Sequence, residues 1–201
     1  MRMRRATLIT LQVNGRKHEV AVQPNAVLLH TLRDLGYTDV KNGCEIGECG
    51  ACAVLLNGQP VNSCMVLTVQ ADGATITTNA GLGTIDKPHV IQEAFADTGA
   101  VQCGFCTSGM VIATVALLDQ NPDPTEAEIR EALSGNLCRC TGYGQIISAV
   151  QLAAERLSDL ASSPASSLRE DASSRSEEGR ESDPEDRILL ADEQMEGGER
   201  S

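Results

Sequence analysis

The first part of the chain alternates apolar and polar residues with a period of two, the pattern of strands that bury one face. Residues 7–13 show it, and Val20 and Val22 continue it after Asn14-Gly15. Asn-Gly between two alternating runs predicts a β-hairpin with a two-residue turn. Further predicted elements are a helix over residues 26–35, a second hairpin around Asn57-Gly58 and a late strand at residues 75–78. Together these elements predict a small mixed sheet packed on one helix.

Beyond residue 83 the apolar spacing changes from that of strands to that of helices. A capping box, Thr125-x-x-Glu128, opens one helix, because its side chains satisfy N–H groups that the first turn leaves free. Gly135 is predicted to end this helix. The other predicted helices cover residues 90–96, residues 108–119 and a stripe formed by Ile146, Val150, Ala153 and Leu157. Four helices of this length predict a compact helical domain.

The periodic pattern ends at residue 162. Polar and charged residues dominate from there on, which predicts disorder, because too little apolar surface is available to offset the entropy of ordering. The apolar island Ile188-Leu189-Leu190 is interpreted as incidental. Residues 161–201 hold 5 Lys/Arg against 12 Asp/Glu, which is more than half of the net charge of −12. This acidic balance gives no basis for nucleic-acid binding, which requires a basic face.

Composition indicates that the folded part needs a stabilising element besides its core. Only 2% of the residues are aromatic and Trp is absent, so apolar burial per residue is low. Eight cysteines could supply disulfides or metal ligands. The basic start leads into a strand pattern rather than an export signal, and no apolar run is long enough for a membrane span. A cytoplasmic location is therefore predicted, where clustered cysteines more often bind metal than form disulfides.

The first cysteine group has the spacing Cys44-x4-Cys49-x2-Cys52 and is completed by Cys64. This spacing with a distant fourth cysteine is the plant-type [2Fe–2S] pattern. Glycines between the ligands allow backbone N–H groups to turn toward negatively charged sulfurs. Zinc prefers two short paired motifs, whereas Cys64 has no close partner in the sequence. The spacing and the glycines together predict a [2Fe–2S] cluster.

The second group combines Cys103-x2-Cys106 with Cys138-x-Cys140. Spacing alone does not decide between zinc and an iron–sulfur cluster, although C-x-C is unusual for a zinc knuckle. The helix predicted just after Cys106 would place its positive N-terminal dipole near an anionic cluster. Both kinds of metal centre stay open at this point.

Apart from the cysteines, the sequence shows no constellation typical of a catalytic site. The three histidines are scattered, and no phosphate-binding loop or nucleophile–base pair is present. Glu45 and Glu48 flank the first group, but a solvated loop explains them as well as acid–base chemistry does. The chain is therefore predicted to carry electrons for a partner, with no substrate chemistry and no catalytic residue of its own.

Three long motifs resemble the small iron–sulfur subunit of the molybdenum hydroxylases, the xanthine dehydrogenase family. Residues 43–52 (GCEIGECGAC) are similar to the family's first-cluster loop, and residues 101–110 (VQCGFCTSGM) and 135–143 (GNLCRCTGY) resemble its second-cluster motifs. The resemblance extends over residues 6–160 and favours an iron–sulfur cluster over zinc in the second group. Asn79-Ala80-Gly81 departs from the Glu-Gly often found between the two domains, and the tail has no family counterpart.

The resemblance implies an α+β fold with a plant-ferredoxin-like (β-grasp) domain, a four-helix domain and a disordered acidic tail. The implied boundaries are residues 1–80, 81–161 and 162–201. Each domain would bind one [2Fe–2S] cluster, with the ligands Cys44, Cys49, Cys52 and Cys64 in the first and Cys103, Cys106, Cys138 and Cys140 in the second. By position, Gln102 and Cys140 match residues that lie against the pterin in this family.

The resemblance also implies partner subunits. A large subunit would hold molybdopterin and hydroxylate the substrate with oxygen from water, and a medium subunit would bind FAD. Electrons would pass from molybdenum to the cluster of the helical domain, then to that of the ferredoxin domain, and then to FAD. The motif regions look most like bacterial xanthine dehydrogenase small subunits, which implies xanthine or another N-heterocycle as substrate. Alternatives are a carbon monoxide, aldehyde or nicotinate dehydrogenase, a free two-cluster ferredoxin, or a zinc-stabilised interaction module.

Overall fold

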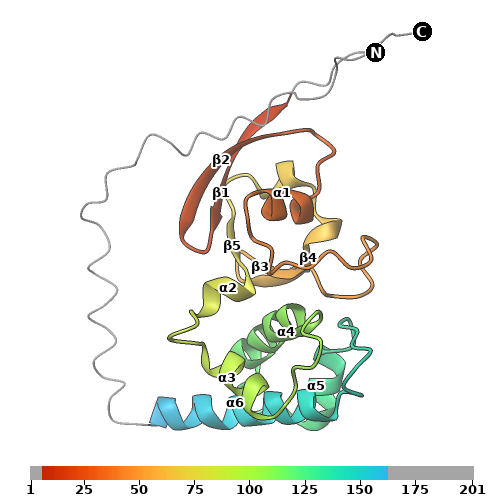
Figure 1. Cartoon of the computed structure of the whole chain (residues 1–201). Helices are drawn as coiled ribbons and strands as arrows, with labels where there is room; N and C mark the ends of the chain where they lie inside the picture. The colour runs from red at the N-terminus through yellow and green to blue at the C-terminus, as the bar shows by residue number, and fades with distance from the viewer. Residues whose placement is uncertain (1–5, 163–201) are drawn as a thin grey trace.

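The computed structural model describes residues 6–162 of the 201-residue chain (Figure 1). The predicted disordered tail, residues 162–201, therefore lies outside the described residues, apart from Ser162, which ends the last helix. A sheet with one helix across it lies above a group of helices in Figure 1, and the short helix α2 (Asn79–Leu82) connects the two parts. This arrangement agrees with the mixed sheet followed by helices that the sequence predicts.

The sheet contains five strands in the order β2-β1-β5-β3-β4. Their bounds are Thr7–Val13 (β1), Arg16–Val22 (β2), Ala53–Leu56 (β3), Gln59–Asn62 (β4) and Thr75–Thr77 (β5). Only β1 and β5 run parallel, and the other neighbours are antiparallel. The two predicted hairpins, at Asn14-Gly15 and Asn57-Gly58, are confirmed, and all four turn residues have the positive φ that a type I′ turn requires.

One core lies between the sheet and helix α1 (Leu28–Asp34). The sequence predicts this helix to begin at residue 26, but Val27 is extended, with φ −95° and ψ 144°, and it forms a β-bridge with Leu67. This contact, distant in the chain, delays the helix by two residues. Two 3₁₀ turns, Ser63–Met65 (η1) and Thr68–Ala71 (η2), follow β4 and pack against α1.

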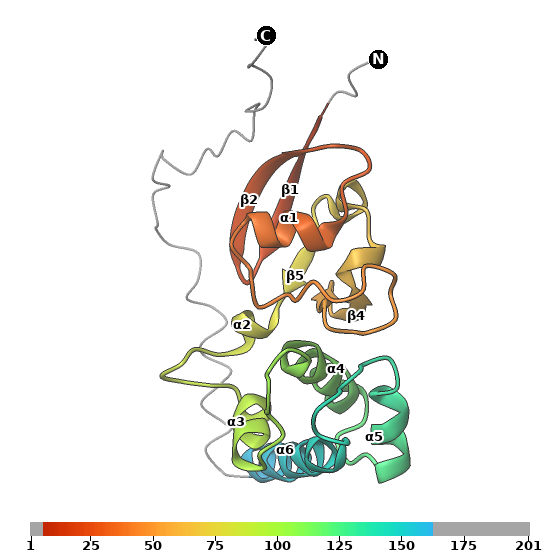
Figure 2. The same cartoon turned by 45° about the vertical axis from the view of Figure 1, so that its right-hand side comes forward.

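A second core lies among the helices after α2. Their bounds are Val90–Asp97 (α3), Thr107–Gln120 (α4), Glu126–Ala132 (α5) and Gly144–Ser162 (α6). The predicted capping box is confirmed, because Glu128 N donates to Thr125 Oγ1 and Thr125 N donates to Glu128 Oε2 at 2.7 Å. Helix α4 is buried on most of its circumference and contacts α2, α3, α5 and the strands β3 and β4. It is therefore the element on which the sheet part and the helical part meet (Figures 1 and 2).

The predicted boundary after residue 80 falls within α2, between the two cores, and it stays a prediction. Leu55 of β3 shows how closely the two parts are joined, because its side chain belongs to the core of the helical part. Among residues 6–162, no helix has the length and apolar character needed to cross a membrane.

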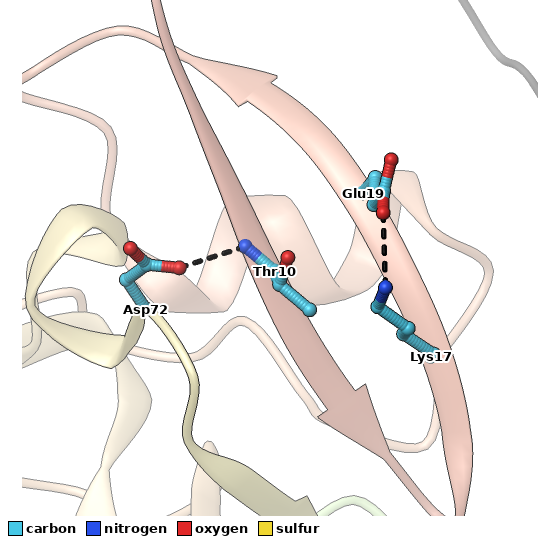
Figure 3. A network of polar contacts seen from close by, with 4 residues as sticks. All are labelled: Thr10, Lys17, Glu19 and Asp72. Carbon is cyan, nitrogen blue, oxygen red and sulfur yellow. Dashed lines mark hydrogen bonds and ion pairs between the residues drawn. The ribbon is translucent and has the colours of Figure 1, made fainter.

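The side chain of Asp72, three residues before β5, accepts a hydrogen bond from the backbone of β1. Thr10 N donates to Asp72 Oδ1 at 2.8 Å (Figure 3). In addition, Gly73 N donates to Thr10 O at 2.8 Å. We expect Asp72→Ala to lower the free energy of unfolding by about 1 kcal/mol, since Thr10 loses this acceptor. Glu19→Ala is the control, because the Lys17–Glu19 pair in Figure 3 is exposed and a pair of this kind typically contributes about 0.5 kcal/mol. Equal midpoints of thermal unfolding for the two variants would contradict this role of Asp72.

Candidate iron–sulfur sites

The first four cysteines come together from a loop and a 3₁₀ turn. Cys44, Cys49 and Cys52 lie in the loop that leads into β3, and Cys64 lies in η1. The Cys44 and Cys49 thiols are within hydrogen-bonding reach of each other, and so are those of Cys52 and Cys64. Cys52 and Cys64 are buried against the core of the sheet, whereas Cys44 and Cys49 are half-buried. The group therefore has an inner and an outer pair of thiols.

Backbone N–H groups point at the outer sulfurs. The N–H groups of Ile46 and Cys49 hydrogen-bond the Cys44 thiol and lower its pKa to about 6. Burial instead raises the pKa of Cys49, and burial with the neighbouring Cys52 thiol raises that of Cys64 to about 11. Close packing leaves no room for a side chain at Gly43, where a Cβ atom would lie 2.8 Å from Cys49 Sγ. The loop thus holds sulfurs among N–H donors, the environment that an anionic cluster requires.

The second four cysteines lie at the ends of two segments of the helical part. Cys106 immediately precedes α4, and Cys138 and Cys140 lie in the loop between α5 and α6. Here Cys103 is within hydrogen-bonding reach of Cys140, and Cys106 of Cys138. The first of these pairs is exposed and the second half-buried. The same division into an outer and an inner pair therefore occurs in both groups.

A tyrosine and a threonine organise the loop that carries Cys138. The Tyr143 hydroxyl accepts a hydrogen bond from Cys138 N at 2.9 Å and donates one to Asn136 O at 3.1 Å. Thr141 Oγ1 lies 3.1 Å from Cys138 Sγ. Both residues belong to the motif that resembles the family, but their contacts with Cys138 were not anticipated from the sequence. The only hint of these contacts in the sequence is that two residues with hydroxyl groups, Thr141 and Tyr143, follow closely after Cys138 and Cys140.

The thiols of the second group differ in their proton affinity for identifiable reasons. Burial alone would raise the pKa of Cys138, but hydrogen bonds from Thr141 and from backbone N–H groups outweigh it and lower the value to about 7. Burial raises the pKa of Cys106 to about 12. The Phe105 N–H lowers the pKa of Cys103, and the hydrogen bond with Cys103 raises that of Cys140. Each pair thus contains one thiol whose anion is stabilised by its surroundings.

The arrangement in pairs fits a two-iron cluster. A [2Fe–2S] cluster is held by four cysteines, two on each iron, so that thiolates are needed two by two. Within residues 6–162, no three His, Cys, Asp or Glu side chains converge as on a single metal ion, and all eight cysteines are free of disulfides. Ser108 Oγ, two residues after Cys106, is buried without a hydrogen-bond partner among the described residues. A buried hydroxyl needs an acceptor, and cluster sulfur is an anionic one.

A surface cleft of about 480 Å³ lies beside Cys103 of the second group. It is lined by Arg33, Thr38, Lys41 and Asn42 from the sheet part and by Cys103, Gly104 and Phe105 from the helical part. Gln102 lies beside Cys103 and is exposed, as is Cys140. The predicted ligands are thus brought together in their two groups, while the predicted contact of Gln102 and Cys140 with a pterin stays a prediction.

Comparisons with known proteins cover the same two parts of the chain. Residues 11–79 match the family model of the 2Fe-2S iron-sulfur cluster binding domain, and residues 78–151 match that of the [2Fe-2S] binding domain. The nicotinate dehydrogenase small FeS subunit of Eubacterium barkeri is 53% identical over 149 residues, which cover 74% of this chain and 95% of that protein. The chain belongs to the iron–sulfur subunits of the molybdenum hydroxylases. The resemblance seen in the sequence is thereby confirmed, and so are two [2Fe–2S] binding domains.

Other members of this family have names that refer to different substrates. The xanthine dehydrogenase iron-sulfur-binding subunit of Escherichia coli O157:H7 is 43% identical and covers 74% of this chain and 96% of that subunit. A crystal structure of quinoline 2-oxidoreductase from Pseudomonas putida 86 matches with a TM-score of 0.74 and 42% identity, covering 77% of this chain and 98% of that one. These matches therefore do not favour xanthine dehydrogenases, the likeness that the sequence motifs suggested, over the other members of the family.

Proposed function

We propose that this chain is the electron-transfer subunit of a molybdopterin-dependent hydroxylase. It relays electrons from a molybdenum site in a large subunit, through two [2Fe–2S] clusters, to FAD in a medium subunit. The observation that carries the proposal is the gathering of all eight cysteines into two groups of paired thiols, each group with an outer pair near the surface. Bound clusters supply one-electron redox chemistry, while the chain positions them and surrounds their sulfurs with N–H donors.

The two groups differ in how exposed their cysteines are to a partner. Cys103 and Cys140 are exposed, as is Gln102 beside them, so a partner can approach the second group without any rearrangement. We assign this surface to the pterin-bearing large subunit and the first group to the flavin side. The order of transfer is then molybdenum, second cluster, first cluster and FAD.

For the substrate of the assembled enzyme we propose an aromatic nitrogen heterocycle. Several relatives bear names of this chemical class, among them a nicotine 6-hydroxylase small subunit of Paenarthrobacter nicotinovorans at 48% identity and the nicotinate and xanthine dehydrogenase subunits. An aldehyde is the second candidate, because an aldehyde oxidoreductase iron-sulfur-binding subunit of Escherichia coli K12 is 42% identical. Turnover of nicotinate, xanthine and an aromatic aldehyde by the complex purified with its partners separates these candidates.

The first test of the proposal is the metal content of the purified chain. Protein purified without oxygen should be red-brown and contain about four irons and four acid-labile sulfides, since each group of four cysteines holds one [2Fe–2S] cluster. Two distinct signals should appear in electron paramagnetic resonance (EPR) spectra after reduction. Stoichiometric zinc without sulfide would instead support the zinc-stabilised interaction module, and a stable, active monomer without partners would support a free ferredoxin.

A further inference from the structure

The loops that carry the two cysteine groups are hydrogen-bonded directly to each other. Leu137 N donates to Cys49 O at 3.0 Å, and the Asn136 side chain donates through Nδ2 to Gly50 O at 3.2 Å. Cys49 belongs to the first group, and Leu137 precedes Cys138 of the second group. The path from Cys49, a predicted ligand of the first cluster, to Cys138, a predicted ligand of the second, therefore consists of one hydrogen bond and the backbone of Leu137.

Two glycines make this approach possible. A Cβ atom on Gly109, in helix α4, would lie 2.1 Å from the Gly50 carbonyl oxygen and 3.1 Å from Asn136 Nδ2. A Cβ atom on Gly50 would lie 2.5 Å from both Asn136 Nδ2 and the Gly135 carbonyl oxygen. Real Cβ atoms do not approach backbone oxygens so closely, so any side chain at either position would move the loops apart. The helix, the first loop and the second loop are thus packed backbone against backbone.

The hydrogen bond from Asn136 to Gly50 O lies in a buried place, which restricts its geometry. Asn136 is 7% exposed, and Gly50 O also accepts a hydrogen bond from Ala53 N at 3.1 Å. A buried neutral donor or acceptor that has no hydrogen-bond partner destabilises the fold by about 1–3 kcal/mol. The Asn136 amide and the Gly50 carbonyl are therefore held in their paired positions. The contact consequently has one favourable geometry rather than a range of loose ones.

We infer that this contact, here named the interloop clamp, fixes the separation of the two clusters and provides the bonded route between them. The clamp consists of Gly50, Gly109, Asn136 and the hydrogen bond from Leu137 N to Cys49 O. Its role as an electron route rests on the proposed function, whereas its role in joining the loops does not. Asn136 acts as a positioning residue, since it holds Leu137 in register with Cys49 rather than contacting a cluster.

Gly109→Ala in the full chain tests the clamp. Alanine normally stabilises a helix relative to glycine by about 1 kcal/mol, so any loosening here comes from the contact with Gly50. We expect full cluster content, faster hydrogen exchange of the Leu137 amide, and weaker magnetic interaction between the two reduced clusters in EPR spectra. Electron transfer between the clusters should slow in the same variant, because the hydrogen-bonded connection from Leu137 N to Cys49 O lengthens. Gly144→Ala is the control, because nothing lies within 4 Å of the position that its methyl group would take in helix α6.

Asn136→Ala keeps the inference testable where Gly109→Ala does not fold. It removes one hydrogen bond without adding volume, and it should raise exchange at Leu137 and weaken the magnetic interaction in the same direction. Wild-type exchange and wild-type interaction between fully loaded clusters in a folded variant of either kind overturn the clamp and leave the proposed function standing. Zinc in place of iron in the wild-type chain overturns the proposed function, and the exchange of the Leu137 amide then still decides whether the loops are clamped.

Discussion

Replacing Cys49 by serine is expected to remove one cluster and leave the other. Iron and sulfide should fall to about half of the wild-type content, because a [2Fe–2S] cluster needs all four ligands and serine is a poor substitute for a thiolate. Cys49 is the appropriate choice within the first group. Its partner thiol is that of Cys44 in the outer pair, whereas Cys52 and Cys64 are part of the buried core. Iron analysis and EPR spectra of the purified variant measure the outcome.

Cys106→Ser is the reciprocal control. It should remove the EPR signal that the Cys49 variant retains, and retain the one that the Cys49 variant lacks. Because cluster binding and folding are linked, circular dichroism must first show that the helices persist in each variant. Loss of both signals from a folded Cys49 variant would show that the eight cysteines do not form two independent centres.

The same variants determine the order of electron transfer in the assembled complex. With Cys49→Ser, substrate should still reduce the remaining cluster within a single turnover, while reduction of flavin slows by orders of magnitude. With Cys106→Ser, electrons should stop before either the first cluster or the flavin. The proposed order is wrong if substrate no longer reduces the remaining cluster of the Cys49 variant while flavin is still reduced at the normal rate.

Local signals account for the parts of the fold that the sequence predicts well. Asn14-Gly15 and Asn57-Gly58 determine their hairpins almost alone, since both residues of each turn have positive φ. The end of a helix depends more on its surroundings. Helix α5 ends with Leu133 as its C-cap, two residues before the predicted stop at Gly135, because the chain there turns toward the first cysteine loop. Short elements such as α2, with four residues, have no periodic pattern to detect.

The candidate site, like the fold, was predicted from the sequence only in its local features. Spacing placed the eight cysteines in their two groups, but it contains no information on which thiols lie together. The pairs join residues from separate segments, such as Cys52 with Cys64 and Cys106 with Cys138. Asn136 was missed for the same reason, because its partner Gly50 is 86 residues away in the sequence. Contacts of this kind depend on how α4 packs against the sheet, which no local pattern specifies.

Gly50→Ala is expected to be strongly damaging, because among residues 6–162 this glycine combines a positive φ with a close approach of a backbone oxygen. Gly50 has φ +67°, a conformation that costs an alanine about 1–2 kcal/mol. The added methyl group would also meet Asn136 Nδ2 and the Gly135 carbonyl oxygen, each at 2.5 Å. A backbone oxygen cannot rotate away, so the clash adds about 1–3 kcal/mol or more through displacement of the second loop. The midpoint of thermal bleaching of the clusters should therefore fall by roughly 10 °C.

Gly15→Ala separates the two causes of this loss. Gly15 has φ +79°, close to that of Gly50, but nothing lies within 4 Å of the position of its methyl group. Its midpoint should fall by roughly 2–8 °C, the effect of backbone strain alone. The excess loss in Gly50→Ala then measures the contact between the two cysteine loops. If both variants bleach at the same temperature, the loops are not packed against each other at Gly50.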